Sequence, residues 1–161
     1  MDLAAAQGRS QVPSRLLRNI VMAAGVGASI LFIVFGLLFE LQMFGDGSIF
    51  AYSVAAEDAW GFHWHNISGR LFSYIFAYVP AESYVALTKD AKGGIFIYGL
   101  LHFSAPLLGL ATTWAADRTP GRLIFVYACV STACLSPLVF GFPTEMWMAH
   151  AVFWPALALC L

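Results

Sequence analysis

The stretch GGIFIYGLLHFSAPLLGLATTWAA, residues 93–116, decides the fold class of this chain. It contains 24 residues without a charge and lies between Lys92 and Asp117. At 1.5 Å per residue, a helix of that length extends about 36 Å, which exceeds the roughly 30 Å of a bilayer's hydrocarbon core. We therefore predict a membrane-spanning helix over this stretch.

The composition of the whole chain agrees with a membrane environment. Of the 161 residues, 60% are hydrophobic and 11% are charged, and the mean hydropathy is +0.77. Soluble domains carry about 25% charged residues, so bulk water is not the main solvent of this chain and a lipid bilayer is its expected partner. The net charge of -1 provides no basic tract for a phosphate backbone, which argues against nucleic acid as a partner.

Further uncharged runs predict more membrane helices. The uncharged run 19–39 is too long for the roughly 7 to 15 residues of a signal-peptide core, so we expect a first membrane helix from about Leu16 to Met43. Residues 123–140 and 146–161 predict two more helices, whereas 67–87 is interrupted by charges and a proline. We expect an all-α polytopic transmembrane helical bundle in one domain, 1–161, with five membrane helices, or four if 67–87 does not cross. An interfacial segment is expected near 48–66, because it mixes tryptophans with polar side chains.

The basic residues at the start of the chain predict its orientation. Arg9, Arg15 and Arg18 precede the first apolar run, so residues 1–15 are expected to be a mobile polar tail in the cytoplasm. The predicted location is the inner (plasma) membrane, crossed several times.

The later basic residues do not fix the number of crossings. Lys89 and Lys92 would be cytoplasmic with five spans, and Arg118 and Arg122 would be cytoplasmic with four.

Three charged residues, Glu40, Arg70 and Glu82, are predicted to be polar groups inside the membrane. Five spans are preferred because Arg70 would then lie at the depth of Glu40 and pair with it, which removes an isolated charge from each.

Small residues in the first predicted helix suggest an association surface. Residues 23–29 include Gly25 and Gly27 among alanines and a serine. Such residues let a second helix backbone approach closely, and this drives association where lipid removes the hydrophobic effect. We expect a homo-oligomer or a larger membrane complex, and loss of association on Gly25→Leu or Gly27→Leu.

His102 is the most suggestive single residue. It lies about ten residues into the predicted helix, where an ionisable side chain indicates a functional site. Its neighbours at helical spacing are mostly small, so we expect it to point into the bundle. Pro106 has no N–H to donate to the carbonyl of His102, which leaves an acceptor beside the imidazole. A proton, a cation or a polar ligand fits such a site.

The other histidines permit cofactor hypotheses. His102 and His150 would bind haem if they faced each other at matched depth. His63 and His65 are two residues apart and would share a transition metal in an extended segment, with a neighbouring carboxylate completing the site. The cofactor is left open between haem, a metal and none.

No phosphate-binding loop, nucleophile elbow or paired carboxylates are present in the sequence, so no catalytic residue is assigned. Three function classes remain. The leading class is a non-catalytic assembly subunit or a subunit for small-solute or lipid transport. The second is a histidine-dependent metal or b-haem membrane oxidoreductase. The third is a portion of a larger polytopic membrane protein.

Overall fold

The computed structural model describes residues 14–57, 70–139 and 145–161, and over these ranges the chain is helical or in turns, with no strand. The all-α prediction is therefore confirmed for the described residues. In chain order the elements are α1 (Ser14–Leu38), η2 (Leu41–Met43), α2 (Asp46–Ala55), α4 (Leu71–Ser73), η4 (Tyr74–Tyr78), α5 (Val79–Thr88), α6 (Ala91–Ala116), α7 (Leu123–Val139) and α8 (Glu145–Cys160).

Two of the described helices are long and apolar enough to cross a membrane. They are α1, over Arg15–Leu38, and α6, over Ala91–Ala116, which contains the stretch predicted first from the sequence. Helices α7 and α8 have 17 and 16 residues, or about 26 and 24 Å. The expectation of five membrane-spanning helices is thus not confirmed.

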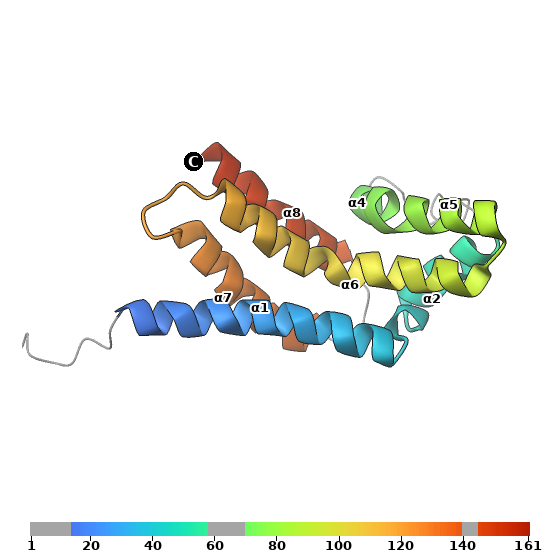
Figure 1. Cartoon of the computed structure of the whole chain (residues 1–161), viewed down its shortest axis with the longest axis horizontal. Helices are drawn as coiled ribbons and strands as arrows, with labels where there is room; N and C mark the ends of the chain where they lie inside the picture. The colour runs from blue at the N-terminus through green and yellow to red at the C-terminus, as the bar shows by residue number, and fades with distance from the viewer. Residues whose placement is uncertain (1–13, 58–69, 140–144) are drawn as a thin grey trace, which may run out of the picture.

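Helix α6 runs through the middle of the structure, and most of the other elements contact it (Figure 1). Helix α8 packs against its second half, where a Cβ added at Gly109 would lie 2.6 Å from the carbonyl oxygen of Ala151. Helix α1 is antiparallel to α6 and contacts it through Phe32 and Phe103, whose ring centroids are 5.1 Å apart. Helix α7 packs mainly against α1.

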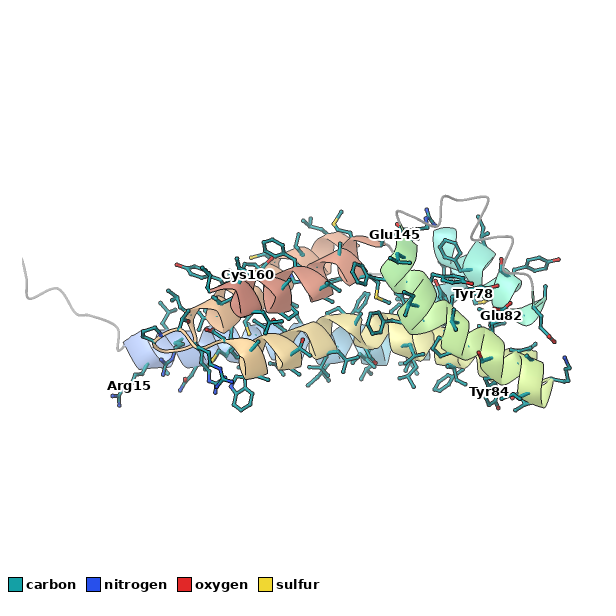
Figure 2. All side chains as sticks on the ribbon, turned by 90° about the horizontal axis from the view of Figure 1, so that it is seen from above. Arg15, Tyr78, Glu82, Tyr84, Glu145 and Cys160 are labelled. Atoms are coloured by element: carbon teal, nitrogen blue, oxygen red, sulfur yellow. The ribbon has the colours of Figure 1, made fainter. Side chains whose placement is uncertain are left out.

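The first half of α6 is covered by different elements, namely α2 and the helix formed by α4, η4 and α5. A Cβ added at Gly94 would collide with the side chain of Val85 on α5. A hydrophobic cluster fills this region, with Phe50 and Val54 from α2 packed beside Tyr78 and Tyr98. Helix α8 and the helix over residues 71–88 therefore follow one another along α6, as both views show (Figures 1 and 2).

The helix over residues 71–88 continues through Pro80, where the sequence suggested a break. The five residues of η4 form a π-helical turn, in which the N–H of Val79 donates to the carbonyl of Tyr74. A π-turn shifts the backbone so that the missing N–H and the ring of a following proline are tolerated. This rearrangement keeps the helix continuous.

One other predicted boundary was wrong, and one predicted segment is partly helical. Helix α1 ends at Leu38, and Glu40 follows in the left-handed conformation at φ 52°, which stops the helix before the predicted end at Met43. The predicted interfacial segment near 48–66 begins inside α2, whose Phe50, Ala51 and Val54 are buried in the core. The part of that segment from 58 to 66 lies outside the described residues.

The outer faces of the long helices carry large apolar side chains. More than 45% of the surface of each of these residues is exposed: Leu16, Leu17, Ile20, Ile30, Leu31, Val34 and Leu38 on α1, Leu123, Tyr127 and Leu138 on α7, and Met146, Phe153 and Leu159 on α8. Soluble monomers rarely expose contiguous apolar surface of this extent. The surface therefore favours an apolar surrounding medium.

Candidate functional site

The middle of α6 is held in place by contacts on either side of it, one at the start of the helix and one in its second half. Asp90 caps the first turn, accepting a hydrogen bond from the N–H of Gly93 at 3.0 Å. That bond lowers the pKa of Asp90 below its ordinary value of 3.8, and the Tyr84 hydroxyl at 3.2 Å acts in the same direction. In the second half of α6, Gly109 is in close contact with α8, and this contact fixes the position of the helix. His102 lies between these two anchors.

His102 points into the structure, as predicted. Only 1% of its surface is exposed, and its ring lies 5.9 Å from the rings of both Tyr98 and Phe103. Among the described residues, neither Nδ1 nor Nε2 has a hydrogen-bond partner. A buried polar group without a partner costs about 1–3 kcal/mol. The buried imidazole of His102 therefore lowers the free energy of unfolding.

Three other buried polar atoms on neighbouring elements have no partner among the described residues. They are Oε1 of Gln42 on η2, Oγ of Ser73 on α4 and Nε1 of Trp147 on α8. Gln42 lies against Gly99, where a Cβ would be 2.9 Å from its Cδ. We call His102, Gln42, Ser73 and Trp147 the central polar cluster.

An ion pair lies beside the central polar cluster. Nε of Arg70 is 2.7 Å from Oε1 of Glu145, and the guanidinium lies 4.8 Å from the ring centroid of Phe50. Figure 2 shows Glu145 where α8 begins, next to the start of the helix over residues 71–88. The pair, together with Ser73 and Met148, lines a cleft of about 30 Å³, which has room for one water molecule.

The partner predicted for Arg70 was wrong. The structure places Glu145 against Arg70, whereas Glu40 is exposed in the turn that ends α1. The reason is that residues 71–88 start beside α8 and not beside the end of α1. Glu82, the third predicted polar group, is half-buried in the first turn of α5.

His150 already has partners through one ring nitrogen. Trp154 Nε1 donates to Nε2 of His150 at 3.1 Å, and Ser131 Oγ lies 2.9 Å from the same nitrogen. Because the indole N–H can only donate, Nε2 accepts, and the neutral ring carries its proton on Nδ1. An iron ligated through Nε2 would displace both contacts.

The haem hypothesis for His102 and His150 stays a prediction. The ring neighbours of His102 are Tyr98 and Phe103, whereas those of His150 are Trp147 and Trp154. The cleft beside Arg70 and Glu145 is lined by neither histidine.

The metal hypothesis for His63 and His65 concerns residues outside the described ranges. Within 14–57, 70–139 and 145–161, no group of three or more histidine, cysteine, aspartate or glutamate side chains is placed to hold a metal ion. The metal site therefore also stays a prediction.

Sequence reasoning missed Gln42, Ser73 and Trp147 as members of the site. The one available signal was the polar type of Gln42 and Ser73 within otherwise apolar runs. Comparison of the chain with protein families, curated proteins and solved structures finds no match. The chemistry of the site therefore has to be argued from its own residues.

Proposed function

We propose that this chain is a multi-pass protein of the inner (plasma) membrane that crosses four times, through α1, α6, α7 and α8. The exposed apolar side chains on the outer faces of α1, α7 and α8 support this proposal, since lipid is the medium that such faces fit. The helices α7 and α8, at about 26 and 24 Å, would cross with flanking residues at the interfaces or with local thinning of the bilayer.

The distribution of arginines supports a cytoplasmic N-terminus. The start of α1, the loop between α6 and α7 and the end of α8 all lie at one end of the structure, opposite the turn between α5 and α6 (Figure 1). Arg15 and Arg18 thereby share an end with Arg118 and Arg122, whereas Lys89 and Lys92 lie at the other. Four spans with the arginine end inside follow the positive-inside rule.

In this arrangement the helix over residues 71–88 does not cross the membrane. Its last turn lies beside the first turn of α6, and its first turn reaches only the middle of α6, where Arg70 meets Glu145. It therefore lies with α2 toward the outer side. We replace the preference for five spans with four.

We further propose that the chain is non-catalytic and binds or passes a small uncharged polar solute at the central polar cluster. The observation that carries this proposal is the burial of His102 with both ring nitrogens unpartnered. Buried polar atoms are paired in nearly all folds, so an imidazole buried with two unpartnered nitrogens indicates a group kept for a ligand. Donors and acceptors are both present, in Trp147 and Gln42.

The charge at the cluster favours an uncharged solute. Arg70 and Glu145, beside the cluster, neutralise each other, and the members of the cluster are neutral side chains that donate or accept hydrogen bonds. A charged solute would meet no opposite net charge here, and burying an unpaired ion is costly. Urea and glycerol are small uncharged molecules that both donate and accept hydrogen bonds, so they serve as the probe solutes.

The test is solute flux into proteoliposomes, followed by stopped-flow light scattering with urea and with glycerol. The wild-type chain is expected to raise the flux of at least one solute above that of empty vesicles, and His102→Leu is expected to return it to that level. His150→Leu is the matched control, because His150 is bonded to Ser131 and Trp154 outside the cluster, and it should retain the flux. Absence of wild-type flux for both solutes, or equal flux in His102→Leu, contradicts the proposal.

Self-association is part of the same proposal, but the contact surface includes only one of the two glycines expected from the sequence. Gly25 is already used inside the chain, since a Cβ there would lie 2.5 Å from Cα of Cys129 on α7. Gly27 has no atom within 4 Å of an added Cβ, so it remains open to a second copy. We expect Gly27→Leu to weaken a homo-oligomer on blue native gels, and an unchanged oligomer would exclude this face.

A further inference from the structure

A cleft opens at the arginine end of the structure, away from the central polar cluster. It has a volume of about 400 Å³ and is lined by Arg18 and Met22 of α1, Trp114 of α6, and Gly121 and Arg122 of the loop before α7. This volume is in the usual range for small-molecule sites. Two guanidinium groups and two apolar side chains thus share one cleft.

Arg18 is held partly inside the cleft. Its side chain is half-buried, and its Nε is a buried donor without a partner among the described residues. A Cβ added at Gly121 would lie 3.2 Å from Nη1 of Arg18, and Gly121 has φ +71°, which suits glycine. The loop therefore leaves space for this guanidinium beside it.

Arg122 is positioned by Trp114. Its guanidinium carbon lies 4.1 Å from the centroid of the Trp114 ring, and its Nη1 donates to the carbonyl oxygen of Trp114 at the end of α6. Stacking on an aromatic face keeps the in-plane N–H groups of a guanidinium available to an oxyanion. The second cation of the cleft is thus oriented before any ligand binds.

The neighbouring acidic residue does not neutralise these arginines. Asp117 accepts hydrogen bonds from the N–H and hydroxyl of Thr119 at 2.8 and 2.6 Å, and from the N–H of Phe125 at 2.9 Å. Both of its carboxylate oxygens are engaged in holding the loop and the start of α7. The ion pairs found within the described residues, Arg70 with Glu145 and Lys89 with Glu57, lie elsewhere.

We propose that this cleft binds the phosphate of an anionic membrane lipid, with Arg18 and Arg122 contacting the phosphate and Met22 and Trp114 contacting the apolar part of the lipid. Basic pockets between helices at the cytoplasmic surface recognise acidic lipid headgroups in this way. The shared chemistry is a phosphate anion, for which free inorganic phosphate is the other source. The lipid assignment rests on the proposed membrane placement of this end and does not depend on solute flux.

The test is native mass spectrometry of the full chain in detergent, with added phosphatidylglycerol or phosphatidylcholine. The wild-type chain is expected to retain phosphatidylglycerol in preference to phosphatidylcholine. Two charge-assisted contacts are lost in the double variant Arg18→Gln with Arg122→Gln, so retention of phosphatidylglycerol should fall by about tenfold or more. Arg18→Gln alone, which leaves the Arg122 contact to α6 intact, should lower it in the same direction.

The matched control is Arg15→Gln with Arg118→Gln, which removes two exposed charges from the same end but none from the cleft lining. This variant should retain phosphatidylglycerol within about twofold of the wild type, because exposed single charges contribute little. Equal losses in both double variants would show diffuse surface attraction and overturn the site. Equal retention of both lipids by the wild type would also overturn it.

Inorganic phosphate distinguishes the two sources. Millimolar phosphate can compete with the lipid for the same two arginines. If phosphate displaces phosphatidylglycerol from the wild type, and this displacement is absent in the Arg18→Gln and Arg122→Gln double variant, the anion site is supported and its ligand is free phosphate. Retention of the lipid under those conditions would support the lipid headgroup. Each of these results can be obtained whether or not the proteoliposomes show solute flux, so the two proposals fail separately.

Discussion

Replacing Gly25 and Gly27 by alanine gives two closely spaced changes on α1 with opposite expected effects on stability. A Cβ at position 25 would lie 2.5 Å from Cα of Cys129, where ordinary contact is 3.4–4 Å. Helices α1 and α7 would therefore have to separate by about 1 Å, and such overpacking costs about 1–3 kcal/mol. A Cβ at position 27 meets no atom within 4 Å.

The comparison isolates the steric effect, because both substitutions remove a glycine from a helix. That removal gains about 0.5–1 kcal/mol in each case. Gly27→Ala should thus raise the free energy of unfolding of the monomeric chain, and Gly25→Ala should lower it once the overpacking exceeds this gain. The difference between the two variants is the overpacking cost of about 1–3 kcal/mol, or about 2–12 °C in midpoint at 2–4 °C per kcal/mol.

The assay is thermal unfolding of both variants and the wild type in the same detergent, followed by circular dichroism at 222 nm. Gly27→Ala is expected above the wild type and Gly25→Ala below it. If the two midpoints coincide, or if Gly25→Ala is the more stable variant, the close packing of α1 on α7 is wrong.

Three further changes probe the site and the loop. His102→Leu removes unpartnered buried nitrogens, so it should raise the free energy of unfolding by about 1–3 kcal/mol while abolishing solute flux. A lower thermal midpoint would instead indicate that His102 makes a structural hydrogen bond. A double-mutant cycle of Arg70→Met and Glu145→Gln should give a coupling of about 1 kcal/mol for this partly buried pair, and zero coupling in thermal unfolding would reject it. Burial raises the pKa of Asp117, but hydrogen bonds from Thr119 and the start of α7 outweigh it and lower the pKa below 3.8. The ionised carboxylate therefore stabilises the fold at neutral pH, and this contribution falls away as the pH drops below about 4. Asp117→Asn should flatten that acid limb of the stability curve, and an unchanged pH profile would argue against these bonds.

The helices that sequence predicted well are those whose ends are marked by charges. The run ahead of Asp117 and the run after Glu145 correspond to α6 and α8. Burial of His102 was also predicted, because small residues at helical spacing placed it on a packed face. These predictions need only local length and periodicity, which the sequence contains.

The features that sequence could not predict depend on contacts between distant segments. Pro80 looks like a break until the π-turn at Tyr74–Tyr78 is known, and that turn is stabilised by packing against α6. The pairing of Arg70 with Glu145 depends on where α8 starts relative to residues 71–88, and no periodicity encodes that. Gln42 joins the central polar cluster only because Gly99 lets η2 approach α6.

Labelling of single cysteines tests the four-span arrangement most directly. In a chain with Cys129, Cys134 and Cys160 replaced by serine, Leu87→Cys and Arg118→Cys place one exposed thiol at each end of the structure. A membrane-impermeant maleimide applied to intact cells is expected to label Leu87→Cys at once and Arg118→Cys only after permeabilisation. The reverse pattern, with Arg118→Cys labelled in intact cells and Leu87→Cys protected, would restore five spans and contradict the proposed topology.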